Sequence, residues 1–73
     1  MIKLNNGAKV LYQATTEENF IVLATWGNEY ICWFVTQSGH AFWGVYSDDF
    51  EVVKKKYLER IKNNTRMAQT AGI

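Results

Sequence analysis

Hydrophobic and polar positions divide this chain into four short apolar runs, followed by one segment of longer period. The runs are rich in β-branched and aromatic residues, which favour β-strands. Turn-forming residues separate them, with Gly27-Asn28 and Ser38-Gly39 where two-residue hairpin loops would sit. We therefore predict four strands: AKVLYQA (8–14), FIVLATW (20–26), EYICWFVT (29–36) and HAFWGVY (40–46).

The segment that follows has the period of a helix. Its apolar residues form one stripe, made of Phe50, Val53, Tyr57, Leu58 and Ile61. Asp48 and Glu51 have capping-box spacing, and basic residues crowd the later turns, where they complement the helix dipole. These features predict a helix over 48–62.

Short connections between successive strands favour an antiparallel arrangement in chain order. The sequence thus predicts an α+β fold, in which a three- to four-stranded antiparallel β-meander has one C-terminal amphipathic α-helix packed on one face. Residues 1–62 would form this single domain, and residues 63–73 a flexible C-terminal tail.

Two-residue loops at both hairpins fix which residues oppose one another, and opposed residues share a face of the sheet. The first predicted face carries Phe20, Val22, Ala24, Trp26, Ile31, Trp33, Val35, Phe42, Gly44 and Tyr46. The second carries Ile21, Leu23, Thr25, Tyr30, Cys32, Phe34, Thr36, Ala41, Trp43 and Val45. Gly44 lies opposite Trp33 in this register, where its missing side chain leaves room for the indole.

Both faces are apolar, as the run YICWFV (30–35) illustrates, but only one helix is available to cover them. A soluble monomer rarely exposes an apolar patch larger than a few hundred Å². We expect the helix on the second face, and a second copy of the chain or another protein on the first. The alternative is that strand 8–14 curls the sheet, or that residues 1–7 and 63–73 fold over the first face. The expected interface residues are Trp26, Trp33, Phe42, Tyr46 and Phe20.

Size and cysteine content limit what else could stabilise the domain. A chain of 73 residues is only marginally stable without help. Its single cysteine excludes an internal disulfide, and one His with one Cys cannot supply a four-ligand zinc site. We expect no metal, no cofactor and no small-molecule substrate. The lone Cys32, an apolar run of at most six residues and the lack of an apolar leader predict a cytoplasmic protein without a membrane segment.

Charge is distributed unevenly although the net charge is only +1. Residues 1–53 carry two lysines against six carboxylates, whereas residues 54–73 carry six basic residues against Glu59. Strands bearing Trp33, Trp43 and Tyr46 beside a basic helix raise a second hypothesis, the binding of single-stranded nucleic acid. Its contacts would be Lys54, Lys55, Lys56, Arg60 and Lys62. Because the apolar stripe of the helix must face the sheet, however, these cations and the aromatic rings would lie on different surfaces.

Candidate catalytic groups are few. Cys32 and His40 fall on opposite sides of the predicted sheet, which keeps them from forming a nucleophilic pair. We expect Cys32 to be a small buried side chain and His40 a turn residue. A third hypothesis, a small ribonuclease-type toxin, would use His40 as its general base. The carboxylates of Asp48, Asp49 and Glu51 are explained by helix capping and not by a bound cation.

The stretch AFWGVYSDDFEVVKKKYLERI (41–61) resembles short accessory proteins of phages and mobile elements, with an aromatic strand, an acidic helix start and a charged amphipathic helix. Some proteins of this kind bind and disable a host or defence protein. The resemblance therefore implies an inhibitor that acts by occlusion in the host cytoplasm. Together with the sheet pattern, it leads us to expect a small non-enzymatic protein-interaction module that self-associates through its aromatic sheet face.

Overall fold

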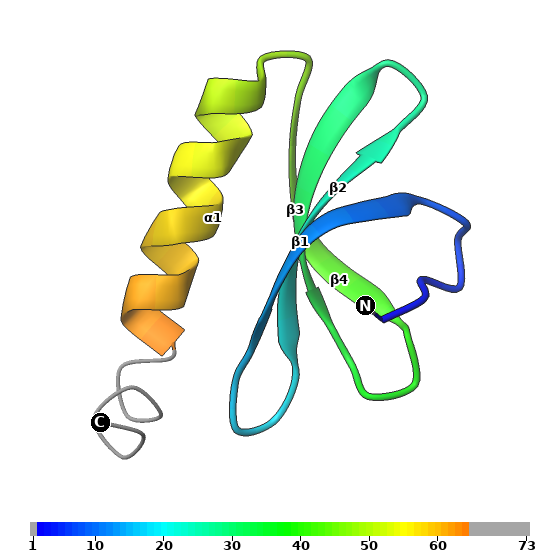
Figure 1. Cartoon of the computed structure of the whole chain (residues 1–73), viewed down its shortest axis with the longest axis vertical. Coiled ribbons are helices and arrows are strands. Elements are labelled where there is room, and N and C mark those ends of the chain that lie inside the picture. The colour runs from blue at the N-terminus through cyan, green and yellow to red at the C-terminus, as the bar shows by residue number, and fades with distance from the viewer. Residues whose placement is uncertain (1, 65–73) are drawn as a thin grey trace.

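The computed structural model describes residues 2–64, which form one antiparallel sheet and one helix (Figure 1). The elements are β1 (Lys9–Thr15), β2 (Phe20–Trp26), β3 (Glu29–Val35), β4 (Ala41–Ser47) and α1 (Phe50–Asn64). The strands lie in the sheet in chain order, so the predicted α+β meander is confirmed with four strands. Each observed strand lies within one residue of its predicted bounds at either end.

The helix begins and ends two residues later than predicted. Its N-cap is Asp49, whose Oδ1 accepts a hydrogen bond from the backbone N–H of Glu51 (3.0 Å). The carbonyl oxygen of Asp49 also accepts from the N–H of Val53. The predicted pairing of Asp48 with Glu51 is therefore wrong by one residue. Residues 63–64 belong to the helix and not to a tail, and residues 65–73 lie outside the described part of the chain.

The register between β2 and β3 is the predicted one throughout, with Val22 opposite Trp33. Between β3 and β4 the prediction holds from Tyr30 opposite Ser47 to Cys32 opposite Val45. The pairing then shifts by one residue. This β-bulge places one extra residue in β4 opposite Trp33 and changes the face on which the first residues of β4 lie.

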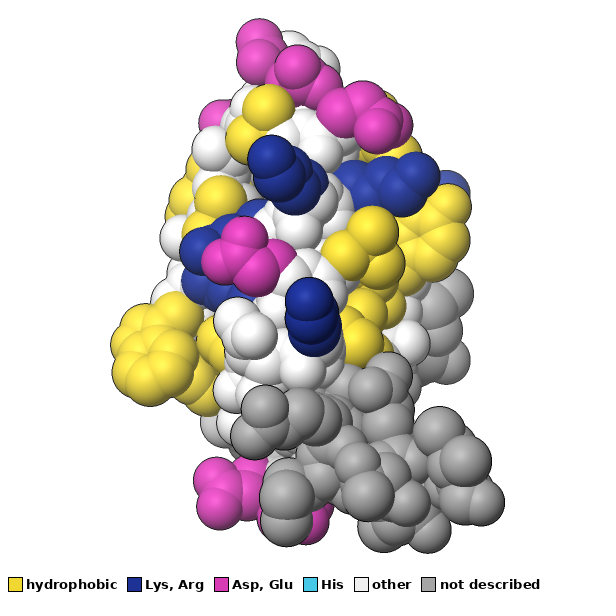
Figure 2. Space-filling model, turned by 90° about the vertical axis from the view of Figure 1, so that its left-hand side faces the viewer, with side chains coloured by type: hydrophobic (Ala, Val, Ile, Leu, Met, Phe, Trp, Pro, Cys, Tyr) yellow, Lys and Arg dark blue, Asp and Glu magenta, His cyan; other side chains and the backbone are white. Residues whose placement is uncertain are grey.

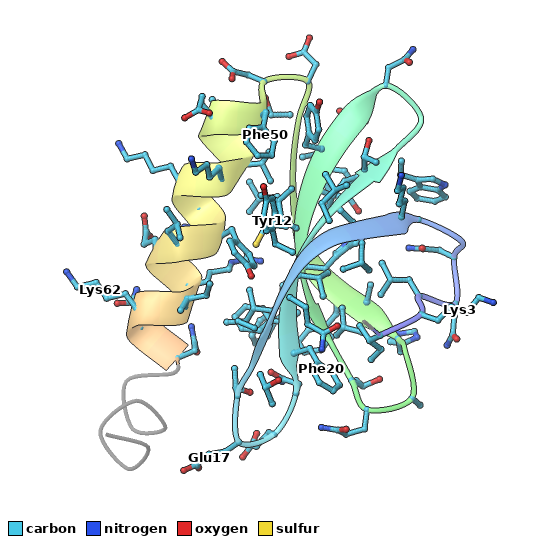
Figure 3. The ribbon with its side chains drawn as sticks, viewed as in Figure 1. Lys3, Tyr12, Glu17, Phe20, Phe50 and Lys62 are labelled. Atoms are coloured by element: carbon cyan, nitrogen blue, oxygen red, sulfur yellow. The ribbon has the colours of Figure 1, made fainter. Side chains whose placement is uncertain are left out.

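The helix packs on the face of the sheet that the sequence favours, which we call the helix face. Its buried residues are Ile21, Leu23, Cys32, Val53 and Tyr57. Phe50 points from α1 toward the sheet, whereas Lys62 points away from it (Figure 3). Leu58 was expected in the buried stripe but is 52% exposed, because it lies at the border of that stripe.

The opposite face, which we call the N-terminal face, is covered by the residues that precede β1 (Figure 1). Its buried residues are Leu4, Ala8, Val22, Ala24, Ile31, Trp33 and Val35, and Ile2 packs beside them. The backbone N–H of Asn5 donates to the carbonyl oxygen of Gly39 (3.1 Å), and that of Ile2 donates to Oε1 of Gln13 (2.6 Å). The expectation of a wholly uncovered face is therefore wrong, and the alternative in which the N-terminal residues fold over it is confirmed.

Candidate functional site

Trp33, the centre of the expected interface, is a core residue with 3% of its surface exposed. Its Nε1–H donates to the hydroxyl oxygen of Tyr46 (3.3 Å). A Cβ on Gly44 would lie 2.7 Å from Nε1 of Trp33 and 2.6 Å from Cε1 of Tyr46. The prediction that Gly44 makes room for the indole is thus confirmed. Trp33 is not accessible to a partner in this structure, because the residues that precede β1 cover its face of the sheet.

Three other predicted interface residues lie around Trp33 on the N-terminal face. Trp26 and Tyr46 are 50% and 53% exposed, and their ring centroids lie 6.1 Å and 6.0 Å from that of Trp33. Phe20 is partly buried and packs against the core of this face (Figure 3). Trp26 and Tyr46 therefore remain accessible at the border of a covered face.

Phe42, the fifth predicted interface residue, lies on the helix face instead. The bulge makes it the pairing partner of Phe34, and the two rings stack at 5.8 Å with 22° between their planes. Its predicted position on the N-terminal face is wrong, because a shift of one residue moves a side chain to the other face of a strand.

Trp43 is the residue that the bulge changes most. It is 73% exposed and has a φ of +54°. Among the described residues, no other non-glycine residue has a positive φ. This backbone region is unfavourable for a bulky side chain, at a cost of about 1–3 kcal/mol. The indole makes edge contacts with Phe34 and Phe42, with ring centroids 5.8 Å and 5.2 Å away.

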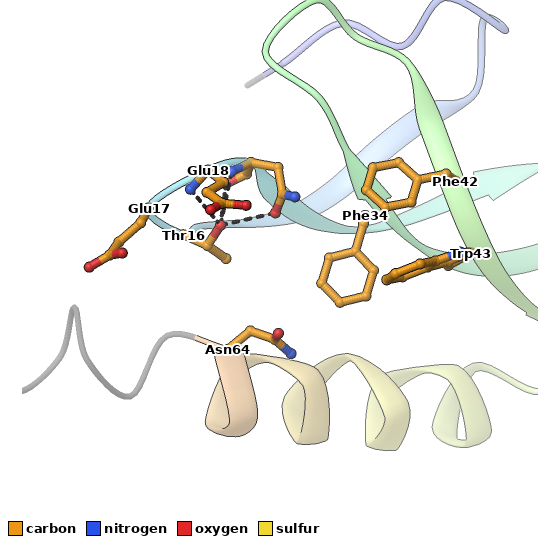
Figure 4. A pocket seen from close by; sticks show the side chains of 8 residues that line it. Thr16, Glu17, Glu18, Phe34, Phe42, Trp43 and Asn64 are labelled. Carbon is orange, nitrogen blue, oxygen red and sulfur yellow. Dashed lines mark hydrogen bonds between the residues drawn. The ribbon is translucent and has the colours of Figure 1, made fainter.

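These three rings line a groove of about 460 Å³, which we call the bulge groove (Figure 4). It is lined by Thr16, Glu17, Glu18, Asn19, Phe34, Phe42, Trp43 and Asn64. The β1–β2 turn forms one wall, Asn64 at the end of α1 another, and the three rings a third (Figure 4). Its volume is in the range of ligand-binding clefts.

The acidic wall of the groove is held by a hydrogen-bonded turn. The hydroxyl of Thr16 accepts from the backbone N–H of Asn19 (3.0 Å) and lies 2.9 Å from both the carbonyl and the Oδ1 oxygens of Asn19. The backbone N–H of Thr16 donates to the same carbonyl (2.8 Å). Glu17 and Glu18 therefore lie at the tip of a turn that hydrogen bonds between Thr16 and Asn19 hold in place.

Arg60 belongs to the helix face, although it was counted among the possible nucleic-acid contacts. Its guanidinium lies 4.8 Å from the centroid of Phe34, and Nη1 donates to the carbonyl oxygen of Cys32 (3.2 Å). Burial raises the pKa of the Cys32 thiol, and the nearby Arg60 charge opposes part of that rise. Arg60 is therefore engaged with the sheet and does not extend the basic surface of the helix.

The remaining basic residues of α1 lie on a surface of mixed character (Figure 2). Lys56 pairs with Glu59 at 3.2 Å, and Lys54 lines a second groove of about 300 Å³ beside Tyr12 and Leu58. Lys55 and Lys62 are exposed. Acidic, basic and apolar side chains alternate over the helix, so the arrangement does not favour the nucleic-acid hypothesis.

His40 and Cys32 do not form a catalytic pair. His40 is exposed in the β3–β4 connection, where its backbone N–H donates to Oγ1 of Thr36, and Cys32 is buried beneath α1. Within residues 2–64 no three His, Cys, Asp or Glu side chains gather as metal ligands would. The same residues contain no helix long and apolar enough to cross a membrane.

Glu17 and Glu18 were not predicted as site residues, and Trp43 was considered only as a stacking ring for the nucleic-acid hypothesis. One signal was present: Ala41, Phe42 and Trp43 are consecutive apolar residues that break the alternation expected of an edge strand, and such a break is typical of a bulge. Nothing in the sequence places the 16–19 turn beside them, because that proximity depends on the tertiary arrangement.

Comparison of the chain with protein-family models, curated proteins and solved structures finds no match. The resemblance to phage accessory proteins therefore stays a prediction, and the case for a function depends on the geometry of the bulge groove.

Proposed function

We propose that this protein is a non-enzymatic binding module that holds a segment of another protein in the bulge groove. The observation that carries the proposal is Trp43, which is exposed and lies in an unfavourable backbone conformation. Backbone outliers of this kind cluster at binding sites and active sites, where the surrounding structure sustains them. Exposed tryptophan is also the residue type most enriched among those that dominate the energy of protein interfaces.

The groove offers such a partner both apolar and polar contacts. Phe34 and Phe42 support the Trp43 ring from the sheet, and the hydrogen-bonded turn presents polar groups on the opposite wall. Contacts that hold the Trp43 ring and hydrogen bonds that hold the turn limit the entropy that binding must overcome. The groove therefore combines the properties of a preorganised recognition site.

Only the resemblance suggests a class of partner. The stretch 41–61 that resembles phage accessory proteins includes Trp43, and some proteins of that kind bind a host or defence protein. We accordingly propose a cytoplasmic inhibitor that occludes the surface of its target. Self-association was expected from the sequence through the aromatic sheet face, which the N-terminal residues cover; a second copy would now have to bind in the groove instead.

A peptide selection tests the proposal and does not require the partner to be identified. A displayed library of random twelve-residue peptides is selected on the wild-type chain, and the bound peptides are then measured against two variants. Trp43→Ala removes the exposed ring of the groove, and Trp26→Ala, the matched control, removes a half-exposed ring from the N-terminal face. We expect peptides whose affinity falls at least about tenfold with Trp43→Ala and less than about twofold with Trp26→Ala.

Two outcomes contradict the proposal. The first is a selection in which no peptide distinguishes Trp43→Ala from the wild type, while circular dichroism shows that the variant is folded. The second is a dimer, seen by light scattering across a dilution series, that Trp43→Ala dissociates. That result would make a second copy of the chain the occupant of the groove.

A further inference from the structure

We infer that the bulge groove selects a partner segment through an arginine or lysine side chain, which lies against Trp43 with its charge toward Glu17 and Glu18. This inference rests on the proposed function and adds the chemistry of recognition. Of the described residues that line the groove, only these two glutamates carry a charge. Both are exposed, and neither has an ion-pair partner among the described residues.

The hydrogen-bonded turn fixes the backbone from which the two glutamate side chains extend. Thr16 and Asn19 close the turn: the backbone N–H of Thr16 donates to the Asn19 carbonyl oxygen, and the N–H of Asn19 donates to Oγ1 of Thr16. The single hydroxyl proton of Thr16 lies within reach of two oxygens of Asn19. Adjacent like charges repel one another, so a cation on the groove side of the turn lowers the energy of the pair, even though the Glu17 side chain is directed away from the rings (Figure 4). An anionic ligand such as a nucleic-acid backbone would be repelled at the same wall.

The aromatic side of the groove is suited to the same ligand. Indole is the aromatic ring that binds cations most strongly, and the face of Trp43 is largely free in the structure. The protein already contains such a contact in this cluster, because the Arg60 guanidinium lies over the Phe34 ring. Arg60 itself is not among the lining residues, and it is held by the Cys32 carbonyl oxygen. The exposed Trp43 ring therefore remains as a second cation-binding surface.

A titration monitored by nuclear magnetic resonance tests this inference directly. Acetyl-arginine-amide is added to the ¹⁵N-labelled full-length protein, and the indole N–H resonances of its three tryptophans are followed. Acetyl-citrulline-amide has nearly the same shape without the charge and serves as the ligand control. We expect the Trp43 resonance to shift with the arginine derivative, to shift little with the citrulline derivative, and to respond less as salt is added.

Two charge-matched double variants identify the carboxylates. Glu17→Gln with Glu18→Gln removes the acidic wall, and we expect it to weaken arginine binding by about threefold to tenfold. Glu29→Gln with Asp48→Asn removes the same charge from exposed positions away from the groove, and we expect no more than a small change. All four side chains are exposed, so all variants should fold.

Equal shifts with arginine and citrulline derivatives would overturn the inference, as would equal losses in the two double variants. Neither result affects the proposed function, which the peptide selection tests separately. Peptides that depend on Trp43 but contain no arginine or lysine would show that the groove binds protein segments by another chemistry. Absence of any peptide that depends on Trp43 would instead remove the proposed function itself.

Discussion

Trp33 and Trp43 lie on neighbouring strands, on either side of the same bulge, and have opposite roles. Trp33 is 3% exposed beneath the N-terminal residues, and Trp43 is 73% exposed beside the end of α1. Gly44 provides space for the Trp33 ring, whereas the Trp43 ring extends from a backbone with an unfavourable φ. Residue type alone thus does not show whether a tryptophan supports the fold or is available for binding. The local strand geometry and the segments that cover each face decide it.

Replacement of each tryptophan by alanine should give the largest difference in the free energy of unfolding. Trp33→Ala should lower the free energy of unfolding by about 3–5 kcal/mol, because it leaves a cavity under Leu4 and removes the hydrogen bond to Tyr46. That is most of the stability of a domain this small. Trp43→Ala should change it by less than about 1 kcal/mol, because the ring is mostly in solvent. Urea denaturation measures both, and equal losses would contradict the contrast.

A substitution at Gly44 tests whether the missing side chain there is what makes room for the Trp33 indole. Gly44→Ala should lower the free energy of unfolding by about 1–3 kcal/mol, because the new methyl group meets both the indole and the Tyr46 ring. Gly27→Ala is the comparison. No atom lies within 4 Å of a Cβ there, so only its positive φ opposes the change, at about 1 kcal/mol. Gly44→Ala alone should also move the indole N–H resonance of Trp33. An unchanged resonance would mean that the two groups are not in contact.

The backbone strain at Trp43 predicts a smaller difference in stability, in which glycine is favoured over alanine. Glycine normally destabilises a strand relative to alanine, but at a φ of +54° the order should reverse. We expect Trp43→Gly to be about 1 kcal/mol more stable than Trp43→Ala, because neither variant has the ring and only alanine retains the unfavourable Cβ. Thermal unfolding of the two variants measures this difference. Lower stability of the glycine variant would show that the backbone relaxes once the indole is removed.

Much of the fold was predictable because local signals determine it. The Gly27-Asn28 loop and the runs on either side fixed the β2–β3 register, and the apolar stripe through Val53 and Tyr57 indicated the helix and its buried side. The cover on the N-terminal face was harder to assign. Leu4 and Ala8 are isolated apolar residues in a turn-rich segment that lacks the hydrophobic periodicity of a strand or helix. Only the tertiary structure shows that they cover the sheet.

The candidate site was less predictable than the fold. A uniform register puts Phe42 opposite Val35, on the same face as Trp33. The chain instead accommodates one extra residue in β4, which brings Phe42 opposite Phe34 and leaves Trp43 exposed. Glu17 and Glu18 belong to a polar turn with no feature of its own that indicates binding. Their relevance arises only from their place across the groove from these rings.

The bulge in β4 also has a consequence for solubility. In the described part of the chain β4 is an outer strand of the sheet, and regular outer strands can pair with the same strand of another molecule to start aggregates. A bulge twists such a strand and interrupts the row of hydrogen-bonding groups that a second molecule would need. A chain shortened by one residue at this point would have straighter pairing, and it should form fibres more readily at high concentration.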